Sequence, residues 1–359
     1  MTYTRIFNGT LIDGTGRAAQ ADAALLIEDN TIRMVGREDD VPRSDGQMRE
    51  IDARGGWILP GMIDCHVHLL MEGVQVAQRM ATPVSLEFFR AVDRMRRTLD
   101  AGVTSVRDAG GADLGVKRAV EDGLVAGPRM QISISILTTT GGHADFTMPD
   151  GTPFQLLPAF PGRPDGVCDG VDAVRKKARE VLRAGADILK VCSTGGVLSP
   201  TDHPEFTQFS PAELEALVQE GAYRRGTKVM AHAQGTEGIK NAVRAGVHSI
   251  EHGIYLDDEA IDLLCERETF LVPTLLAVAS VIEIGRETGA MPAWAVRKAE
   301  EVYAAHRDSI ARAHKAGVRI AMGTDSGVFP HGRNLRELAL LCEVGLSPME
   351  ALLATTRTA

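Results

Sequence analysis

Residues 184–192, with the sequence AGADILKVC, join the end of a helical pattern directly to an apolar strand pattern. Gly185 lies just past the amphipathic run 171–184, where a glycine with positive φ commonly ends a helix. The same joint, Ala-Gly-Val or Ala-Gly-Ala, recurs at 101–103, 245–247 and 316–318. Each recurrence predicts a helix that ends where a strand begins, and this alternation is typical of an α/β fold with a parallel sheet.

Eight strands and the helices between them follow when this pattern is traced in both directions. Strands are expected at 57–63, 103–107, 130–136, 188–192, 228–231, 249–251, 270–274 and 318–322. Helices are expected at 86–100, 171–184, 211–225, 257–267 and 293–316. Ser210 and Glu213 have the spacing of a capping box at the start of one helix. Eight βα units in about 300 residues predict a (β/α)8 TIM barrel. A doubly wound sheet is the alternative, but the glycine-rich phosphate loop expected after its first strand is absent from the sequence.

The first 56 residues have a different pattern. Short β-type runs at 3–7, 24–28 and 31–35 are separated by the turn pairs Asn8-Gly9, Asp13-Gly14 and Asp29-Asn30. These runs predict a small N-terminal β-sandwich segment. We therefore expect two domains, residues 1–56 and residues 57–359, with the second forming the barrel.

Composition excludes several classes of protein. The 359 residues are 44% hydrophobic and 24% charged, as in an ordinary globular protein, and 39 Lys+Arg against 48 Asp+Glu give a net charge of −9. This acidic balance, with no basic run, argues against nucleic acid as a partner. No stretch approaches the roughly 20 apolar residues of a membrane helix, and the N-terminus lacks a secretory pattern. With five scattered cysteines, these features predict a cytoplasmic protein; a homo-oligomer is left open.

The carboxyl ends of five expected strands carry side chains that suit a metal site. These side chains are His66, His68, Lys190, His232, His252 and Asp325. Strand alternation places His66 and His68 on one side together with Asp64, which could orient them. Each side chain alone could be structural, and Lys190 could extend to the barrel mouth. Barrel enzymes keep their chemistry on this face, so the convergence of six such groups predicts a metal-dependent active site.

Longer motifs resemble the amidohydrolase superfamily of metal-dependent barrel hydrolases. The segments PGMIDCHVH (60–68), FNGTLIDGTGR (7–17) and ADILKVCSTGG (186–196) are similar to its first-strand signature, its N-terminal sandwich and its strand with a carboxylated lysine. The segments KVCSTGGVLSP (190–200), EHGIY (251–255) and GTDSGVFPHG (323–332) resemble the imidazolonepropionase-related branch. That branch includes Xaa-Pro and Xaa-Arg/Lys dipeptidases and an ochratoxin-cleaving amidohydrolase.

The resemblance implies a binuclear centre with two divalent ions, zinc in the first instance. His66, His68 and Asp325 would hold one ion, His232 and His252 the other, and Lys190, carboxylated by CO2, would bridge them. The carbamate replaces a cation by an anion that has one oxygen for each ion. A metal-bridging hydroxide would attack the scissile carbonyl, and Asp325 would carry its proton to the leaving nitrogen.

The same resemblance suggests further site residues and a substrate class. Tyr255 and His143 are expected to polarise the carbonyl or bind a substrate carboxylate, and His331, His203 and Arg107 are candidate substrate-binding residues. An alternative for Arg107 is an ion pair with Asp108 or an inner-barrel carboxylate. We expect hydrolysis of amide or peptide bonds in dipeptides or N-acyl amino acids. The alternatives are a cyclic-amide hydrolase of imidazolonepropionase type and a non-catalytic barrel scaffold.

The position of Ala359 gives one more expectation. Superfamily members continue past this point through strands that complete the N-terminal sandwich, so we expect these C-terminal strands to be missing from the sequence. The N-terminal layer would then keep an uncovered apolar face. A longer chain that includes those strands is expected to be more stable.

Overall fold

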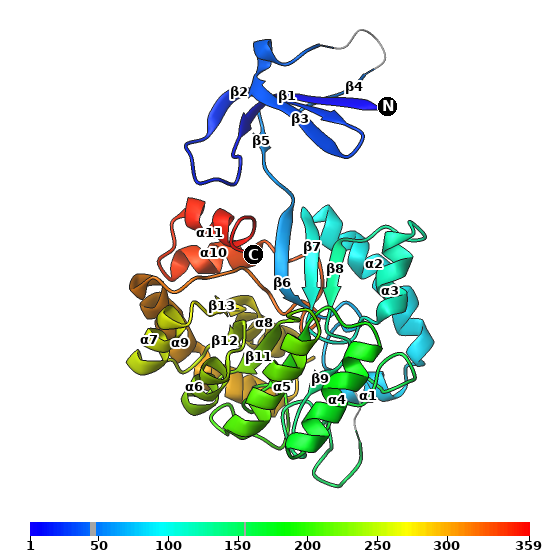
Figure 1. Ribbon diagram of the computed structural model, residues 1–359, viewed down its shortest axis with the longest axis vertical. Coiled ribbons are helices and arrows are strands. Elements are labelled where there is room, and N and C mark those ends of the chain that lie inside the picture. Colours follow the sequence, from blue (N-terminus) through cyan, green and yellow to red (C-terminus); the bar gives the residue numbers. More distant parts are fainter. Residues whose placement is uncertain (44–47, 154–155) are drawn as a thin grey trace. The chain divides into compact units, whose positions relative to one another are not determined.

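Helices alternate with parallel strands through most of the chain in a computed structural model (Figure 1). The structure describes residues 1–43, 48–153 and 156–359. The described residues form two compact units, Met1–Gly61 and Met62–Ala359. No helix in the described part of the chain is both long enough and apolar enough to cross a membrane.

The N-terminal unit is a five-stranded sheet. Its strands are β1 (Tyr3–Leu11), β2 (Gln20–Glu28), β3 (Thr31–Arg37), β4 (Arg49–Asp52) and β5 (Trp57–Ile58), and a short 3-10 turn, η1 (Glu38–Asp40), follows β3. The order is β3-β2-β1-β4, and β5 also pairs with β1. The turn expected at Asn8-Gly9 is wrong: both residues lie inside β1, where Asn8 has a φ of 55° and the register with β2 shifts. A bulge there keeps the strand continuous.

The second unit contains two parallel sheets. One has the order β6 (Met62–Val67), β7 (Val103–Asp108), β8 (Arg129–Ile132). The other has the order β13 (Phe270–Val272), β12 (Ser249–His252), β11 (Val229–Ala233), β10 (Leu189–Cys192), β9 (Ile136–Leu137). The fold is therefore of the α/β class, as expected.

Eleven helices in the described residues accompany these strands. They are α1 (Val76–Met80), α2 (Val84–Asp100), α3 (Leu114–Glu121), α4 (Val171–Arg183), α5 (Pro211–Tyr223), α6 (Thr236–Ala245), α7 (Asp258–Glu266), α8 (Leu275–Thr288), α9 (Ala293–Ala316), α10 (Arg336–Glu343) and α11 (Pro348–Ala354). The expected helix ends are confirmed, because Gly102, Gly185, Gly246 and Gly317 have φ of 85°, 102°, 92° and 88°. The capping box of Ser210 and Glu213 is also formed, at the start of α5.

Three of the expected strands differ from those observed. The strand expected over 57–63 is two strands, since β5 pairs with β1 and β6 pairs with β7. The strand expected over 130–136 is interrupted at Ile134, which has a φ of 66°, so that β8 pairs with β7 and β9 with β10. The strand expected over 318–322 is replaced by single parallel bridges, Leu271 to Ile320 and Val67 to Ser326.

Strand alternation separates the core of the second unit from its polar interior. In β10, Leu189 and Val191 belong to the main apolar cluster, whereas Lys190 and Cys192 line a cavity. All four are buried. Consequently the sheet presents Lys190 to the same cavity as the histidines of the other strands.

Candidate metal centre

Three of the expected ligands meet at the end of β6. His66, His68 and Asp325 each offer one donor atom, all within 4.8 Å of one another, and all three residues are buried. The Oδ1 atom of Asp325 lies 3.6 Å from His66 Nε2 and 3.3 Å from His68 Nε2. The backbone N–H of Asp325 donates to the carbonyl of His66 over 2.7 Å, which fixes this segment beside β6.

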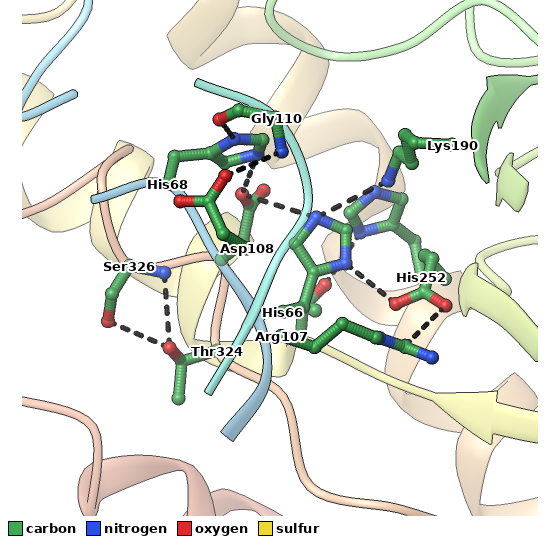
Figure 2. A network of polar contacts seen from close by, with 12 residues as sticks. His66, His68, Arg107, Asp108, Gly110, Lys190, His252, Thr324 and Ser326 are labelled. Atoms are coloured by element: carbon green, nitrogen blue, oxygen red, sulfur yellow. Dashed lines mark hydrogen bonds and ion pairs between the residues drawn. The ribbon is translucent and has the colours of Figure 1, made fainter. Parts of the chain in front are cut away.

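The Nδ1 atoms of His66 and His68 each have a hydrogen-bond partner (Figure 2). His66 Nδ1 lies 2.7 Å from Glu251 Oε2, and His68 Nδ1 lies 2.8 Å from the carbonyl of Gly110. Both partners are acceptors, so Nδ1 carries the proton and Nε2 presents a lone pair. The Oδ1 atom of Asp325 is buried and makes no hydrogen bond to any described residue. Two Nε2 atoms that face a carboxylate oxygen without a hydrogen bond to any described residue fit a divalent cation.

His232, His252 and Lys190 lie next to this trio. The ring centroid of His252 is 5.2 Å from that of His66 and 4.6 Å from that of His232, and Lys190 Nζ is 3.5 Å from His66 Nε2. His252 Nδ1 contacts Thr274 Oγ1 at 2.6 Å, so Nε2 is the nitrogen of His252 that is available as a metal ligand. In His232 the roles of the two ring nitrogens are exchanged. Its Nε2 contacts the carbonyl of Gly195 at 3.0 Å, so Nδ1 is the nitrogen available as a metal ligand.

The charges of the cluster are set by burial and proximity. Burial lowers the pKa of His66, His232 and His252 well below the usual histidine range, and the Lys190 ammonium reinforces the effect. Burial also lowers the pKa of Lys190. For Asp325, burial raises the pKa, but the neighbouring His66 and His68 and Lys190 outweigh it and the net shift is downward. For His68, burial lowers the pKa, but the neighbouring Asp325 outweighs burial and the net shift is upward. Metal binding would require the neutral form of His68, as it does of the other three imidazoles.

A buried ion pair inside the sheets supports His66 from behind. Arg107 Nη2 donates to Glu251 Oε1 over 2.8 Å, and its other nitrogens donate to the carbonyl of Cys65 and to Ser249 Oγ. Of the alternatives for Arg107, the inner carboxylate is therefore its partner. Asp108 instead accepts the backbone N–H groups of Leu69, Gly110 and Ala112. Sequence reasoning missed the role of Glu251, although a carboxylate inside an apolar strand was the available signal.

Asp64 acts on the backbone and not on the imidazoles. Its carboxylate accepts from the backbone N–H groups of His66 and Thr324 and from the side chains of Thr324 and Asn334, at 2.7–3.1 Å. Burial raises its pKa to about 6. Asp64 therefore contacts His66 through its backbone, and it joins β6 to the segment that carries Asp325.

The structure places the remaining expected residues in two groups. His143 lines the same cavity as the six groups above and stacks on His232, with ring centroids 4.1 Å apart. The described lining of that cavity does not include Tyr255, His203, His331 or Arg107. His331 is buried with Nε2 3.2 Å from the carbonyls of His68 and Met71. His203 Nδ1 lies 3.7 Å from Glu205 Oε2 and its Nε2 lies 3.5 Å from Glu301 Oε1. Burial raises the pKa of Tyr255, and the same two carboxylates raise it further.

The rest of the cavity wall is apolar. Its side chains are Met71, Ile136, Ala144, Phe146, Leu156, Leu157, Leu198 and Val328, together with Cys192. A polar cluster in an otherwise apolar pocket is the usual form of a small-molecule site.

Comparison with known proteins identifies the family. A model of the amidohydrolase family matches residues 57–359. Ochratoxinase of Aspergillus niger is 34% identical over 368 residues, which cover 99% of this chain and 75% of ochratoxinase. The crystal structure of a Xaa-Pro dipeptidase with bound methionine matches with a TM-score of 0.88 and 34% identity over 99% of this chain and 87% of the other. A prolidase complexed with N-methylphosphonate-L-proline matches with a TM-score of 0.88 and 36% identity over 99% and 86%. The chain belongs to the amidohydrolase family.

Proposed function

We propose that this protein is a binuclear metal-dependent hydrolase that cleaves the C–N bond of dipeptides or N-acyl amino acids. The observation that carries the proposal is the buried trio of His66, His68 and Asp325, whose free donor atoms point at one another. The similar Xaa-Pro dipeptidase and prolidase structures, bound to methionine and to a phosphonate of proline, favour substrates of amino-acid type.

We infer that the two parallel sheets belong to one closed (β/α)8 barrel. Segment 318–326 supports this inference because it bridges to β13 through Leu271 and Ile320 and to β6 through Val67 and Ser326. On the other side, β8 and β9 are parts of one interrupted strand, with β8 paired to β7 and β9 paired to β10. The ligands then share the carboxyl-terminal mouth of the barrel, where barrel enzymes carry their active sites.

Two ions would be held by different parts of the cluster. His66, His68 and Asp325 would bind one, and His232 through Nδ1 and His252 through Nε2 would bind the other. Lys190, carboxylated by CO2, would bridge them; its lowered pKa favours the neutral amine that attacks CO2 and loses a proton to give the carbamate. Zinc suits this set of nitrogen and oxygen donors. Such ions, when bound, polarise a carbonyl oxygen and make water acidic near neutral pH.

Residues of the chain move the protons and hold the substrate. Asp325 would take a proton from the attacking water and deliver it to the leaving nitrogen, since its Oδ1 atom lies beside His66 and His68. His143 would contact the substrate from the cavity wall, and the apolar wall around Phe146 and Leu198 suits an apolar side chain of the substrate. An oxyanion role for Tyr255 requires its hydroxyl to reach this cavity, and its place beside Glu301 and Glu205 favours a structural role instead.

Hydrolysis assays on protein loaded with zinc and bicarbonate test the function. The panel would contain Xaa-Pro dipeptides, Xaa-Arg dipeptides, N-acyl amino acids and imidazolone propionate, with metal content measured by elemental analysis. We expect two ions per chain and turnover of dipeptides or N-acyl amino acids, both lost in the His66→Ala/His68→Ala double variant. Turnover of imidazolone propionate alone would support the cyclic-amide alternative. Fewer than one ion per chain and no turnover would support the scaffold.

A further inference from the structure

The loop between β10 and α5 contains a buried carboxylate that the metal cluster does not use. Asp202 accepts the backbone N–H of Gly196 at 3.3 Å, the side-chain N–H of Gln208 at 3.2 Å, and the hydroxyl of Ser199. Its side chain is 3% exposed. Burial raises its pKa, but the hydrogen bonds and the neighbouring His143 outweigh burial and bring the pKa to about 2. Asp202 is therefore an ionised group held inside a folded loop.

A lysine from a distant helix holds this loop in place. Lys298, in α9, donates to the carbonyls of Gly196 at 3.1 Å and Ser199 at 2.9 Å and to the carbonyl of Asp202. Its Nζ also lies 3.6 Å from Asp202 Oδ1, so the buried carboxylate and the half-buried ammonium each have an opposite charge as neighbour. The loop between Gly196 and Asp202 is thereby attached to the body of the second unit.

The loop carboxylate and hydroxyl face the imidazole of His143. His143 Nδ1 lies 3.0 Å from Ser199 Oγ and 3.7 Å from Asp202 Oδ2, and its backbone N–H donates to Gln208 Oε1 at 3.2 Å. Gly196 lets the loop come this close, because a Cβ atom there would lie 2.4 Å from His143 Cε1 and 2.9 Å from His232 Cε1.

The hydrogen-bond partners of Ser199 indicate which nitrogen of His143 carries the proton. The single hydroxyl hydrogen of Ser199 is directed at acceptors only, the carboxylate of Asp202 and the carbonyl of Gly196. The Oγ atom can therefore only accept from the ring, and the Asp202 carboxylate can likewise only accept. This pattern favours the His143 tautomer that carries the proton on Nδ1, which leaves Nε2 for the cavity that His143 lines.

We propose that Asp202, acting through Ser199, is a positioning residue for His143: it holds the Nδ1–H group and directs Nε2 toward the substrate. The proposal rests on the proposed function, in which His143 contacts the substrate. A neutral ring then accepts a hydrogen bond at Nε2, and a protonated ring donates one. Without the Ser199 bridge the ring can rotate, and the substrate contact is lost while the metal ligands remain.

A double-mutant cycle on hydrolysis of Ala-Pro tests the kinetic consequence. Ser199→Ala is expected to lower kcat on the order of 10–100-fold, as loss of an orienting partner does elsewhere, with KM changed less and metal content unchanged. In a His143→Ala background, Ser199→Ala should cause no further loss. Ser280→Ala, which alters a buried serine of α8 whose hydroxyl has no hydrogen-bond partner among the described residues, is the control and should match the wild type. An equal additional loss in the His143→Ala background would show a general structural effect and overturn the proposal.

Nitrogen-15 NMR of histidine-labelled protein tests the geometry without any substrate. Among the slowly exchanging Nδ1–H signals of the buried histidines, we expect one that disappears in His143→Gln, weakens or exchanges rapidly in Ser199→Ala and Asp202→Asn, and persists in Ser280→Ala. A His143 ring protonated only at Nε2 would overturn the proposal. If this signal behaves as expected while the wild type hydrolyses nothing in the panel, the proposed function fails and the positioning geometry stands.

Discussion

Single residues at this site adopt backbone conformations that most side chains avoid. Asp325 has a φ of 61° and His252 a φ of 76°, both in the left-handed region. Such conformations cost on the order of 1–3 kcal/mol each and persist only where surrounding contacts enforce them. For Asp325 the contacts are the hydrogen bond to the carbonyl of His66 and the approach of His66 and His68. The strain is consistent with a carboxylate oxygen placed for function.

Asp325→Asn separates the two roles proposed for this residue. The amide keeps one oxygen for the metal but cannot accept and return a proton, so kcat should fall by about 10²–10⁴-fold. Metal content, measured by elemental analysis, should stay near that of the wild type. An Asn variant with full metal content that kept most of its kcat would contradict the proton-transfer role.

Single elements of the fold depend on local capping that can be tested apart from the site. The Ser210 side chain caps the backbone of Glu213, and Glu213 caps Ser210 in return, at the start of α5. Ser210→Ala should lower the free energy of unfolding by about 1 kcal/mol, because the backbone N–H of Glu213 loses its acceptor, and should leave kcat unchanged. Urea unfolding followed by circular dichroism measures this difference. Glu215→Ala, at an exposed position of the same helix, is the control and is expected within about 0.5 kcal/mol of the wild type.

Helix α8 begins in a different way, with its cap supplied by another helix. Thr274, at its N-cap, has a φ of 52° and gives no side-chain cap; the buried carboxyl of Glu337 in α10 accepts from the N–H groups of Leu275 and Leu276. Burial raises the pKa of Glu337 from 4.5 to about 8. Between these pH values the folded chain holds a proton that the unfolded chain has lost. Stability contributed by this group is therefore full below about pH 4.5 and falls as pH rises to about 8.

Glu337→Gln removes this proton linkage. We expect Tm of the wild type to decrease between pH 5 and pH 8 more steeply than Tm of the variant, whatever their absolute difference. Scanning calorimetry across this range gives both slopes. Glu343→Gln, in the same helix but exposed, should keep the wild-type slope. Parallel curves for the wild type and Glu337→Gln would show that Glu337 does not titrate in this window.

At the scale of the whole molecule, the cluster of candidate metal ligands joins segments from both parallel sheets. His66 comes from β6, Lys190 from β10, His232 from β11 and His252 from β12, while Asp325 lies in segment 318–326, between the bridged residues Ile320 and Ser326. Ions bound here would contact only the folded chain, so removing them should lower stability.

Dialysis against EDTA should therefore lower Tm, and zinc with bicarbonate should restore it. A ligand present at 100 times its Kd contributes about 2.7 kcal/mol, enough for a clear shift by differential scanning fluorimetry. The His66→Ala/His68→Ala double variant should respond much less to either treatment. A wild type whose Tm ignores both EDTA and zinc would indicate that these residues hold no ion.

Local chemistry made much of the architecture predictable from the sequence. The helix ends at Gly185 and its three counterparts, the capping box at Ser210, and the α/β alternation all depend on neighbours a few residues apart. The alternation of side chains along a strand indicated that His66 and His68 share a strand face. The trio that they form with Asp325 is present in the structure. The interruption at Ile134 had no comparable local signal, and the Asn8-Gly9 pair indicated a turn where the structure has a bulge.

Contacts between distant residues were decided only by the tertiary structure. His66 and Glu251 are 185 positions apart, and no periodicity indicates that they meet. The choice of ring nitrogen in His232, the pairing of Arg107 with Glu251 and the approach of Asp202 to His143 likewise depend on how whole strands and loops pack. Periodicity and turn chemistry act over a few residues and can be read from the sequence, whereas the partner of a buried polar group is set by the packing of the entire second unit.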